Sequence, residues 1–312
     1  MKMLAALGIM LILLGIIALP SMGIASGYEE IKVNGGGTIT GKVILKGPKP
    51  SVRVFPLVLY PFSPFCKIIS DGEGNVIVQE FIIGSDGGMQ DVVVALLDVE
   101  KGKPFQPITS QLVAENCMFH PADIPSNVHT FSDKGGRVHH EHPLVRVIKN
   151  HQPISVVNRD PIIHNGQIYQ SERGNIILNF PIPVSDKPRG GVIHLDPGKR
   201  VTQMICGMHE FMQSWGFAVD NPYYAMTKKD GAFKIDRLPP GHYRVVAWHP
   251  QIKPIQKEIT VSEGETVELN FEFDAATVKR PEYEVQGRFR IGPEAHPHEH
   301  LTGDKDKLFI QE

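Results

Sequence analysis

Four side chains that suit a soft or borderline metal ion occur in two short segments of the sequence. Cys206, His209 and Met212 follow one another at intervals of three residues, directly after a predicted strand at residues 201–205. His164 stands about forty residues upstream. One thiolate, two imidazoles and one thioether are the donor set of a trigonal copper site with a weak axial methionine, a geometry used for electron transfer. The spacing therefore predicts a metal site.

Short strands must position these residues. Runs rich in Val and Ile, bounded by Gly, Asp and Pro, recur between residues 36 and 273, and residues 36–115 contain no convincing 3.6-residue periodicity. Cys206 and His209 would lie on the loop that leaves one strand, with Met212 able to cap the same ion, while His164 must come from a different strand. We predict an all-β fold made of several small β-sandwiches.

The two segments together resemble the cupredoxins. That family carries one ligand in a His-Asn pair on one strand, here His164 and Asn165, and three on the loop before the last strand. The Cys-x2-His-x2-Met spacing is similar to the amicyanin type, and the resemblance covers roughly residues 144–220. It implies a Greek-key barrel that holds one type 1 (blue) copper through His164, Cys206, His209 and Met212. It also implies that Asn165 hydrogen-bonds to the cysteine loop and orients it, and that His209 lies near the surface and passes the electron.

Two features of the loop leave alternatives open. The first feature is the Cys-x-x-His pattern, which is weak when it stands alone. The alternative is that Cys206 is a buried free thiol and His209 a surface residue. The second concerns the axial position, because the loop lacks the proline that amicyanin-type loops often contain and Met208 adds another thioether. We expect Met208 to pack in the core, which leaves Met212 as the axial candidate.

The N-terminus has the pattern of an export signal. Lys2 precedes seventeen apolar residues at 3–19, and small residues follow. We predict cleavage after Ala25 and a periplasmic or otherwise extracytoplasmic protein. The alternative is an uncleaved anchor, because seventeen residues lie at the short end of the roughly 17–25 that span a membrane. A membrane is a partner only in that case.

The two remaining cysteines, Cys66 and Cys117, are predicted to form a disulfide, because exported thiols tend to pair. Closing their 51-residue separation contributes roughly 4 kcal/mol in the loop-entropy model. The alternative is that one of them is a second metal ligand.

Histidines outside the predicted site fall into two groups. Short His-rich stretches are candidates for weak metal uptake, although solvated charged loops have the same composition. These stretches hold His139, His140 and His142, and, in the tail, His296, His298 and His300. Five further histidines lack a partner pattern and are expected to be surface or ordinary core residues, namely His120, His129, His151, His194 and His249.

Changes in composition divide the chain into five parts. We predict a signal peptide at 1–25, an N-terminal β-sandwich-like domain at 36–115 and a cupredoxin-like domain at 116–220 with an inserted His-rich loop at 121–145. A further sandwich follows at 221–275 and a polar tail at 276–312.

The sandwich at 221–275 resembles the carboxypeptidase regulatory-like (transthyretin-like) domain. The resemblance rests on Asp230-Gly231-x-Phe233-x-Ile235 and Leu238-Pro239-Pro240-Gly241-x-Tyr243, and it covers about 50 residues. In that family the module is structural. An exported group of proteins that is often named after methylamine utilisation joins such a domain to a cupredoxin, and that name implies no activity.

Composition and missing motifs exclude several functions. With 32 Lys and Arg against 34 Asp and Glu, the formal charge is −2, which lacks the basic excess of a general nucleic-acid binder. No G-x-x-x-x-G-K-[ST] loop signals a nucleotide site. Neither Gly-x-Ser-x-Gly nor His-Glu-x-x-His is present, so we predict that the protein is not an enzyme.

We therefore expect an exported type 1 copper protein that carries one electron at a time. Its partner would be another redox protein, a cytochrome or a dehydrogenase, met through a small and transient interface. The alternative is a non-catalytic cell-envelope scaffold or copper-handling protein, helped by the His-rich stretches.

Overall fold

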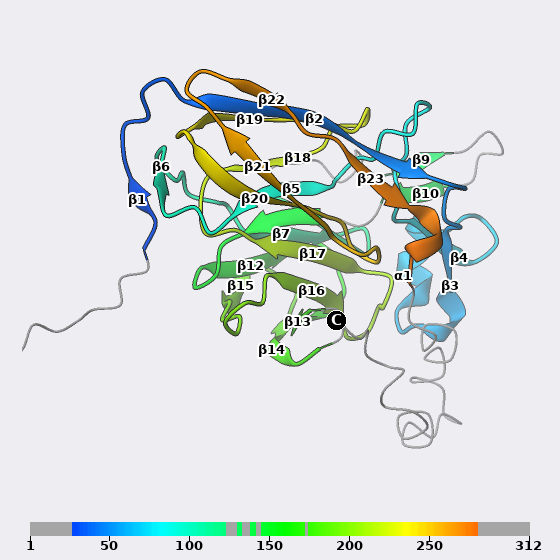
Figure 1. Ribbon diagram of the computed structural model, residues 1–312. Helices are drawn as coiled ribbons and strands as arrows, with labels where there is room; N and C mark the ends of the chain where they lie inside the picture. Colours follow the sequence, from blue (N-terminus) through cyan, green and yellow to red (C-terminus); the bar gives the residue numbers. More distant parts are fainter. Residues whose placement is uncertain (1–26, 123–129, 133–137, 142–144, 172–173, 280–312) are drawn as a thin grey trace, which may run out of the picture.

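The computed structural model describes residues 27–122, 130–132, 138–141, 145–171 and 174–279 (Figure 1). Within these ranges the fold is all-β, as predicted, and the one α-helix is the single turn α1 (Ser63–Cys66). None of the helices in these ranges is long and apolar enough to cross a membrane. The predicted signal peptide at 1–25 and most of the predicted tail, residues 280–312, lie outside the described residues.

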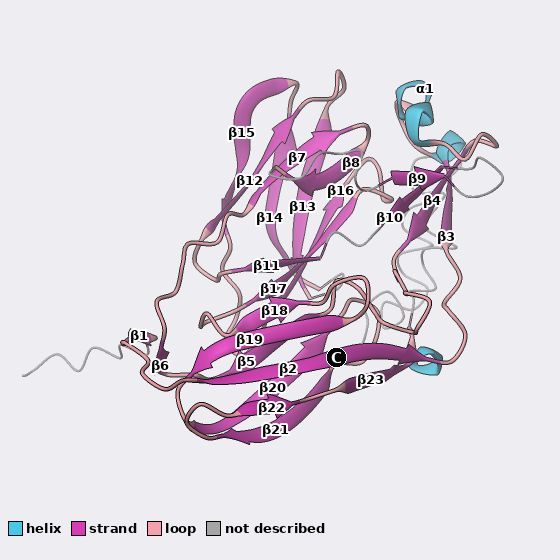
Figure 2. Ribbon diagram, turned by 90° about the horizontal axis from the view of Figure 1, so that it is seen from above, coloured by secondary structure: helices cyan, strands magenta, loops and turns pink. Residues whose placement is uncertain are grey.

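A first β-sandwich, built from residues 111–218, carries the predicted ligands. Its larger sheet has the strand order β11-β17-β16-β13-β14 and its smaller sheet the order β15-β12-β7-β8; the strands are labelled in Figure 2. The strands are β7 (Gln111–Glu115), β8 (Met118–Pro121), β11 (Val145–Ile148), β12 (Pro153–Asn158), β13 (His164–Gln170), β14 (Ile176–Ile182), β15 (Ser185–Val192), β16 (Val201–Cys206) and β17 (Gln213–Ala218).

A second β-sandwich combines strands from both ends of the described chain. One sheet has the order β18-β5-β20-β21, and the other has the order β19-β2-β22 with β23 also paired to β2. Its strands are β2 (Gly37–Lys46), β5 (Val93–Leu97), β18 (Tyr224–Met226), β19 (Ala232–Leu238), β20 (Gly241–Trp248), β21 (Ile255–Val261), β22 (Thr266–Glu268) and β23 (Phe271–Asp274), followed by the turn η4 (Ala275–Thr277). A short pair, β1 (Glu29–Glu30) with β6 (Lys101–Gly102), lies at one end (Figure 2).

Residues 53–79, which we call the cover, pack on the first sandwich. They comprise β3 (Arg53–Pro56), η1 (Leu57–Leu59), α1, η2 (Lys67–Ile69) and β4 (Asn75–Gln79). Strand β4 also pairs with the hairpin β9 (Thr130–Ser132) and β10 (Val138–Glu141). Apolar side chains of the cover, including Phe55, Leu57 and Tyr60, join the core that lies between the two sheets of the first sandwich.

The predicted N-terminal sandwich at 36–115 is not a separate domain. Its strands are distributed over three units: β2 and β5 complete the second sandwich, β3 and β4 belong to the cover, and β7 pairs with β12 in the first sandwich. The segment at 121–145, predicted as an inserted loop, contributes the hairpin β9–β10. Local alternation shows which face of a strand is buried, but it does not identify the strand beside it, so the sequence did not show that the strands of 36–115 belong to other units. The predicted boundary at 220 lies in the connection between β17 and β18.

The two sandwiches stack face to face through a third core. On one side Trp215 and Phe217 of β17 face Val246 and Trp248 of β20, and the rings of Phe217 and Trp248 lie 5.2 Å apart. Every residue of β17 is buried because this strand lies between two cores. The first sandwich therefore packs against the second through an apolar core.

A buried polar network joins the cover to both sandwiches. Nη2 of Arg53 lies 2.5 Å from Oε1 of Glu80, and both side chains are almost fully buried. Gln251 donates to the same carboxylate oxygen (2.5 Å), while Gln213 at the start of β17 accepts from Arg53 (3.0 Å). Breaking a buried ion pair by removing one partner costs about 3–5 kcal/mol, so this network restricts how the three units are placed.

One histidine of the second sandwich should make the folded state sensitive to acid. The side chain of His249 is 1 % exposed, its Nδ1 lies 2.8 Å from the carbonyl oxygen of Pro250, and burial lowers the pKa of its imidazole to about 4. The unfolded chain takes up this proton near pH 6.5. Stability is therefore lost as the pH falls from about 6.5 to about 4, by up to roughly 3 kcal/mol.

We expect His249→Asn to flatten the pH dependence of the unfolding free energy in this window, measured by urea denaturation. The matched control is His242→Asn, which replaces a largely exposed histidine and should keep the wild-type slope. A wild-type slope in the His249 variant would contradict the prediction.

Candidate metal centre

The register of two neighbouring strands explains why His164 reaches the cysteine loop. Strands β13 and β16 run antiparallel with Gly166 opposite Cys206. Burial alternates along β13, so His164 shares the inward face with Gly166, two residues away. Because β16 ends at Cys206, His164 extends past that end and lies beside the loop at 207–212.

Backbone hydrogen bonds close this loop. The amide of His209 donates to the carbonyl of Cys206 (3.1 Å), and the amide of Met212 donates to the carbonyl of His209 (2.9 Å). The amide of Cys206 in turn donates to the carbonyl of Met212 (3.0 Å). The three-residue spacing thus corresponds to two successive turns that hold the side chains of Cys206 and His209 close together.

Three of the predicted ligands meet at one point. Nδ1 of His164 lies 3.3 Å from Nδ1 of His209, and the sulfur of Cys206 lies 3.7 and 3.6 Å from these two atoms. An ion about 2.0–2.1 Å from each nitrogen and about 2.3 Å from the sulfur, at tetrahedral or trigonal angles, separates them by roughly 3.3–3.8 Å. Within the described ranges this is the one group of three His, Cys, Asp or Glu side chains that could hold an ion.

The hydrogen bonds behind the two rings determine which nitrogen faces the centre. Nε2 of His164 lies 2.9 Å from Oδ2 of Asp160, and Nε2 of His209 lies 2.9 Å from the carbonyl oxygen of Pro61. Both partners only accept, so both Nε2 atoms carry the proton, and in the neutral rings both Nδ1 lone pairs point at the centre. Converging lone pairs in a buried space are satisfied by a cation.

The charge balance of the site leads to the same conclusion. Burial alone would lower the pKa of His164, but its hydrogen bonds to Asp160 and Cys206 outweigh burial and raise it to about 9. Burial alone would raise the pKa of the Cys206 thiol, but the two imidazoles outweigh burial and lower it to about 6. The site therefore favours a thiolate with positive charge beside it.

The second sandwich has a recognisable family. Residues 218–274 match the carboxypeptidase regulatory-like domain. This agrees with the resemblance drawn from the sequence at 221–275, and β2 and β5 add strands to this domain from outside the matched range.

Solved structures similar to this chain include cupredoxins. A purple cupredoxin from Nitrosopumilus maritimus is 18% identical, with 36% of this chain and 100% of that chain covered and a TM-score of 0.23. A Cu(I) form of an amicyanin variant is 11% identical, with 40% and 98% covered and a TM-score of 0.22. The copper-containing nitrite reductase of Thermus scotoductus is 13% identical, with 38% and 24% covered and a TM-score of 0.24. No curated protein matches the sequence.

Asp160 has a role that the sequence did not predict. Its carboxylate is 2 % exposed and accepts the amides of Asn116 (2.6 Å) and Cys117 (2.9 Å) as well as the His164 ring. Asn116 and Cys117 have φ of 54° and 53° and form the two-residue turn between β7 and β8. The position of Asp160 four residues before His164 was the one sequence signal available.

The predicted disulfide is present and lies beside both ring-orienting groups. Cys66 and Cys117 are bonded, with their Cα atoms 5.6 Å apart. Cys117 donates to Asp160, which holds the His164 ring, and Cys66 closes the helix α1 that follows Pro61, which holds the His209 ring. The disulfide therefore links the partners of the two imidazoles.

His209 is not near the surface, which corrects the expectation drawn from the cupredoxin resemblance. Its side chain is 0 % exposed, because Pro61 and Phe62 of the cover lie over it, with the Phe62 ring 6.4 Å from the imidazole. No pattern in the sequence signals this contact, which joins residues 148 positions apart through a backbone carbonyl.

Asn165 contacts the loop through a different group from the one expected. Its backbone carbonyl accepts the amide of Gly207 (2.9 Å), whereas its side-chain amide donates to Asn179 (3.0 Å) and to the carbonyl of Phe180 (3.2 Å) on β14. A Cβ at Gly207 would lie 2.6 Å from Oδ1 of Asn165, so only glycine fits there without a shift.

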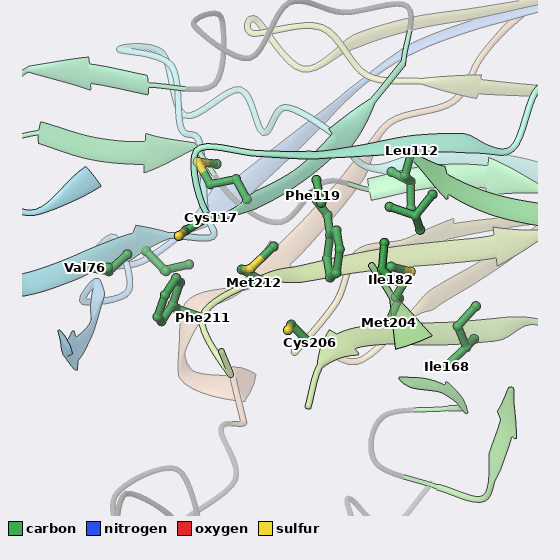
Figure 3. Close-up of a cluster of buried hydrophobic side chains, with 14 of the residues drawn as sticks. Val76, Leu112, Cys117, Phe119, Ile168, Ile182, Met204, Cys206, Phe211 and Met212 are labelled. Carbon is green, nitrogen blue, oxygen red and sulfur yellow. The ribbon is translucent and has the colours of Figure 1, made fainter. Parts of the chain in front are cut away.

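The remaining predicted residues are placed as follows. Met212 is fully buried in the same core as Cys206 (Figure 3), which is compatible with the axial role and leaves that role a prediction. Met208 is partly buried and packs against this core. His139 and His140 lie on strand β10, while His142, His296, His298 and His300 lie outside the described residues.

Replacing Asp160 should weaken metal binding without a ligand being touched. In Asp160→Asn the amide no longer fixes the proton on Nε2 of His164, and loss of such an orienting group typically lowers metal affinity by about 10–100-fold. The measurement is Zn(II) affinity by competition with a chromogenic chelator, with thermal unfolding as a check on folding.

The matched control for this variant is Asp220→Asn, which removes a half-exposed carboxylate paired with Arg200. It should bind Zn(II) as the wild type does. Equal affinities in the two variants would show that Asp160 does not orient a ligand.

Proposed function

We propose that this chain is an exported type 1 copper protein that carries one electron at a time. The observation that carries the proposal is the convergence of the Cys206 sulfur with the Nδ1 atoms of His164 and His209 in a buried site. A thiolate with two imidazoles and a weak thioether from Met212 is the donor set of such copper sites. Bound copper would supply the Cu(II)/Cu(I) couple.

The protein's own part is to keep the ligands in place in both oxidation states. Asp160 and the Pro61 carbonyl fix the two rings, and the disulfide restrains both of these groups. The surrounding core excludes water and packs Met212 in place. Ligands held this firmly need little rearrangement when the charge of the ion changes, which favours fast electron transfer.

Burial of the centre favours a carrier over an enzyme. His164, Cys206 and His209 are each at most 1 % exposed, so a substrate cannot reach an ion held between them. The same burial opposes rapid release of the metal, which a delivery protein needs. An electron, in contrast, can pass through the packed side chains that cover the site.

The cover offers a route from His209 to the surface. It lies over His209 and exposes three apolar side chains, Val58 (83 %), Phe62 (43 %) and Ile68 (59 %). Small apolar contacts of this kind suit a brief encounter with another redox protein. We therefore place the docking of the redox partner at the cover, with Phe62 at the point nearest the His209 ring.

Copper spectroscopy tests the proposed centre. With one equivalent of Cu(II), the full chain should show an intense thiolate charge-transfer band and narrow copper hyperfine splitting in electron paramagnetic resonance. Cys206→Ser should lose both features, and His242→Ala, at a largely exposed site, should keep them. A pale spectrum with broad splitting that Cys206→Ser leaves unchanged would place the copper on the His-rich stretches and end the carrier proposal.

Electron self-exchange tests the route through the cover. Phe62→Arg should slow exchange between the Cu(I) and Cu(II) forms, because it puts like charges at the contact between two copies. The visible spectrum should not change, since Phe62 is not a ligand. Ile176→Arg is the matched control, because Ile176 is similarly exposed (50 %) but lies far from the site: it begins β14, whereas Ile182 at the other end of β14 pairs with His164. Equal exchange rates in the two variants would contradict the route.

A further inference from the structure

Two exposed histidines, for which the sequence showed no partner pattern, lie against each other in the first sandwich, at the end away from the candidate metal centre. Nδ1 of His151, in the turn between β11 and β12, is 3.1 Å from Nδ1 of His194, which follows β15. Their ring centroids are 5.2 Å apart, with an angle of 57° between the ring planes.

This arrangement closely matches the pair of imidazoles in the candidate metal centre. There the Nδ1 atoms of His164 and His209 are 3.3 Å apart, the ring centroids are 5.2 Å apart, and the planes meet at 65°. Two nitrogens that bind one ion at about 2.0–2.1 Å and at a tetrahedral angle lie roughly 3.3–3.4 Å apart. We propose that His151 and His194 form a second metal site, which takes one divalent cation of the borderline class, Zn(II) or Cu(II).

The backbone holds both histidines in position before any ion arrives. The amide of His151 donates to the carbonyl of Ile193 (2.9 Å), and the side-chain oxygen of Asn150 accepts the amides of His151 (3.0 Å) and Leu195 (2.9 Å). His194 stands between Ile193 and Leu195, which are both buried in the core and anchor this short segment. A pair fixed in this way loses little conformational freedom when it binds an ion.

The surroundings of this pair differ from those of the candidate metal centre. Both rings are exposed, and no third His, Cys, Asp or Glu of the described chain joins them within ligand distance. Water would fill the remaining positions, so the ion would exchange with solvent, unlike one held at Cys206. Borderline imidazole ligands favour Cu(II) and Zn(II) over Ca(II) or Mg(II).

The two sites are independent of each other. Strand β12 runs from one site to the other. Pro153, its first residue, pairs with Val192, which is close to His194, and Asn158, its last residue, accepts a hydrogen bond from the amide of Asp160 beside the candidate metal centre. Six residues of extended strand span roughly 20 Å. The proposal therefore does not rest on the proposed electron-carrier function.

Zinc titration of the full chain tests the second site. The six histidines of the two His-rich stretches are first changed to Asn, and the candidate metal centre is loaded with one equivalent of copper. Calorimetry should then detect one Zn(II) ion per chain. Either His151→Ala or His194→Ala should weaken its binding by at least about tenfold, while His242→Ala, at an exposed histidine beside Thr260, should leave it unchanged.

Two results would overturn the proposal: no zinc bound by the six-fold variant, or zinc bound by both alanine variants as tightly as by the six-fold variant itself. In the first case the two imidazoles only share a proton across the 3.1 Å gap. In the second, a further Cys206→Ser substitution shows whether the zinc occupies the candidate metal centre instead. Thermal unfolding confirms that each variant is folded, which both positions should permit because the side chains are exposed.

Discussion

The main constraint on this structure is that two imidazoles and a thiol share one dry space. Lone pairs that converge without water are costly unless a cation or a proton joins them. The acceptors behind the rings, the Asp160 carboxylate and the Pro61 carbonyl, decide that the Nδ1 atoms face inward. Without them, either ring could present an N–H to the centre, and the three donors would no longer form a site for a cation.

Much of the surrounding structure serves to place those two acceptors. The turn between β7 and β8 directs two amides at Asp160, and the disulfide joins this turn to the cover segment that carries Pro61. The cover is in turn fixed by Arg53, which contacts Gln213 at the end of the ligand loop. Gln213 donates to the carbonyl of Glu210 within the loop (2.8 Å). The candidate metal centre is thus held by the β7–β8 turn, the cover and Gln213, none of which supplies a predicted ligand.

The sequence predicted what depends on local spacing. The Cys-x2-His-x2-Met pattern corresponds to two closed turns, and the pairing of Cys66 with Cys117 was predicted from two spare thiols in a chain with a predicted export signal. The pattern of β-rich runs separated by turn residues also gave the fold class.

What the sequence missed depends on contacts between distant segments. Pro61 contributes a backbone carbonyl, which any residue possesses, so its position over His209 left no trace in the residue types. The same holds for the strand partners of β2 and β5, which the sequence assigned to a separate N-terminal domain. His151 and His194 are separated by 43 positions, and only the return of β15 alongside β12 brings them together.

The interleaving of the two sandwiches has a consequence for the order in which the chain acquires its structure. Strand β2 pairs with a strand more than two hundred residues away, since Thr38 lies opposite Thr266. Pairing between segments so distant in the sequence forms slowly. The first sandwich and its cover, in contrast, have all their described strands by Ala218. A chain that emerges from its N-terminus can therefore assemble the pocket around Cys206 while β2 and β5 are still unpaired edges. The second sandwich can then complete last, against a β17 face whose own sandwich is already assembled.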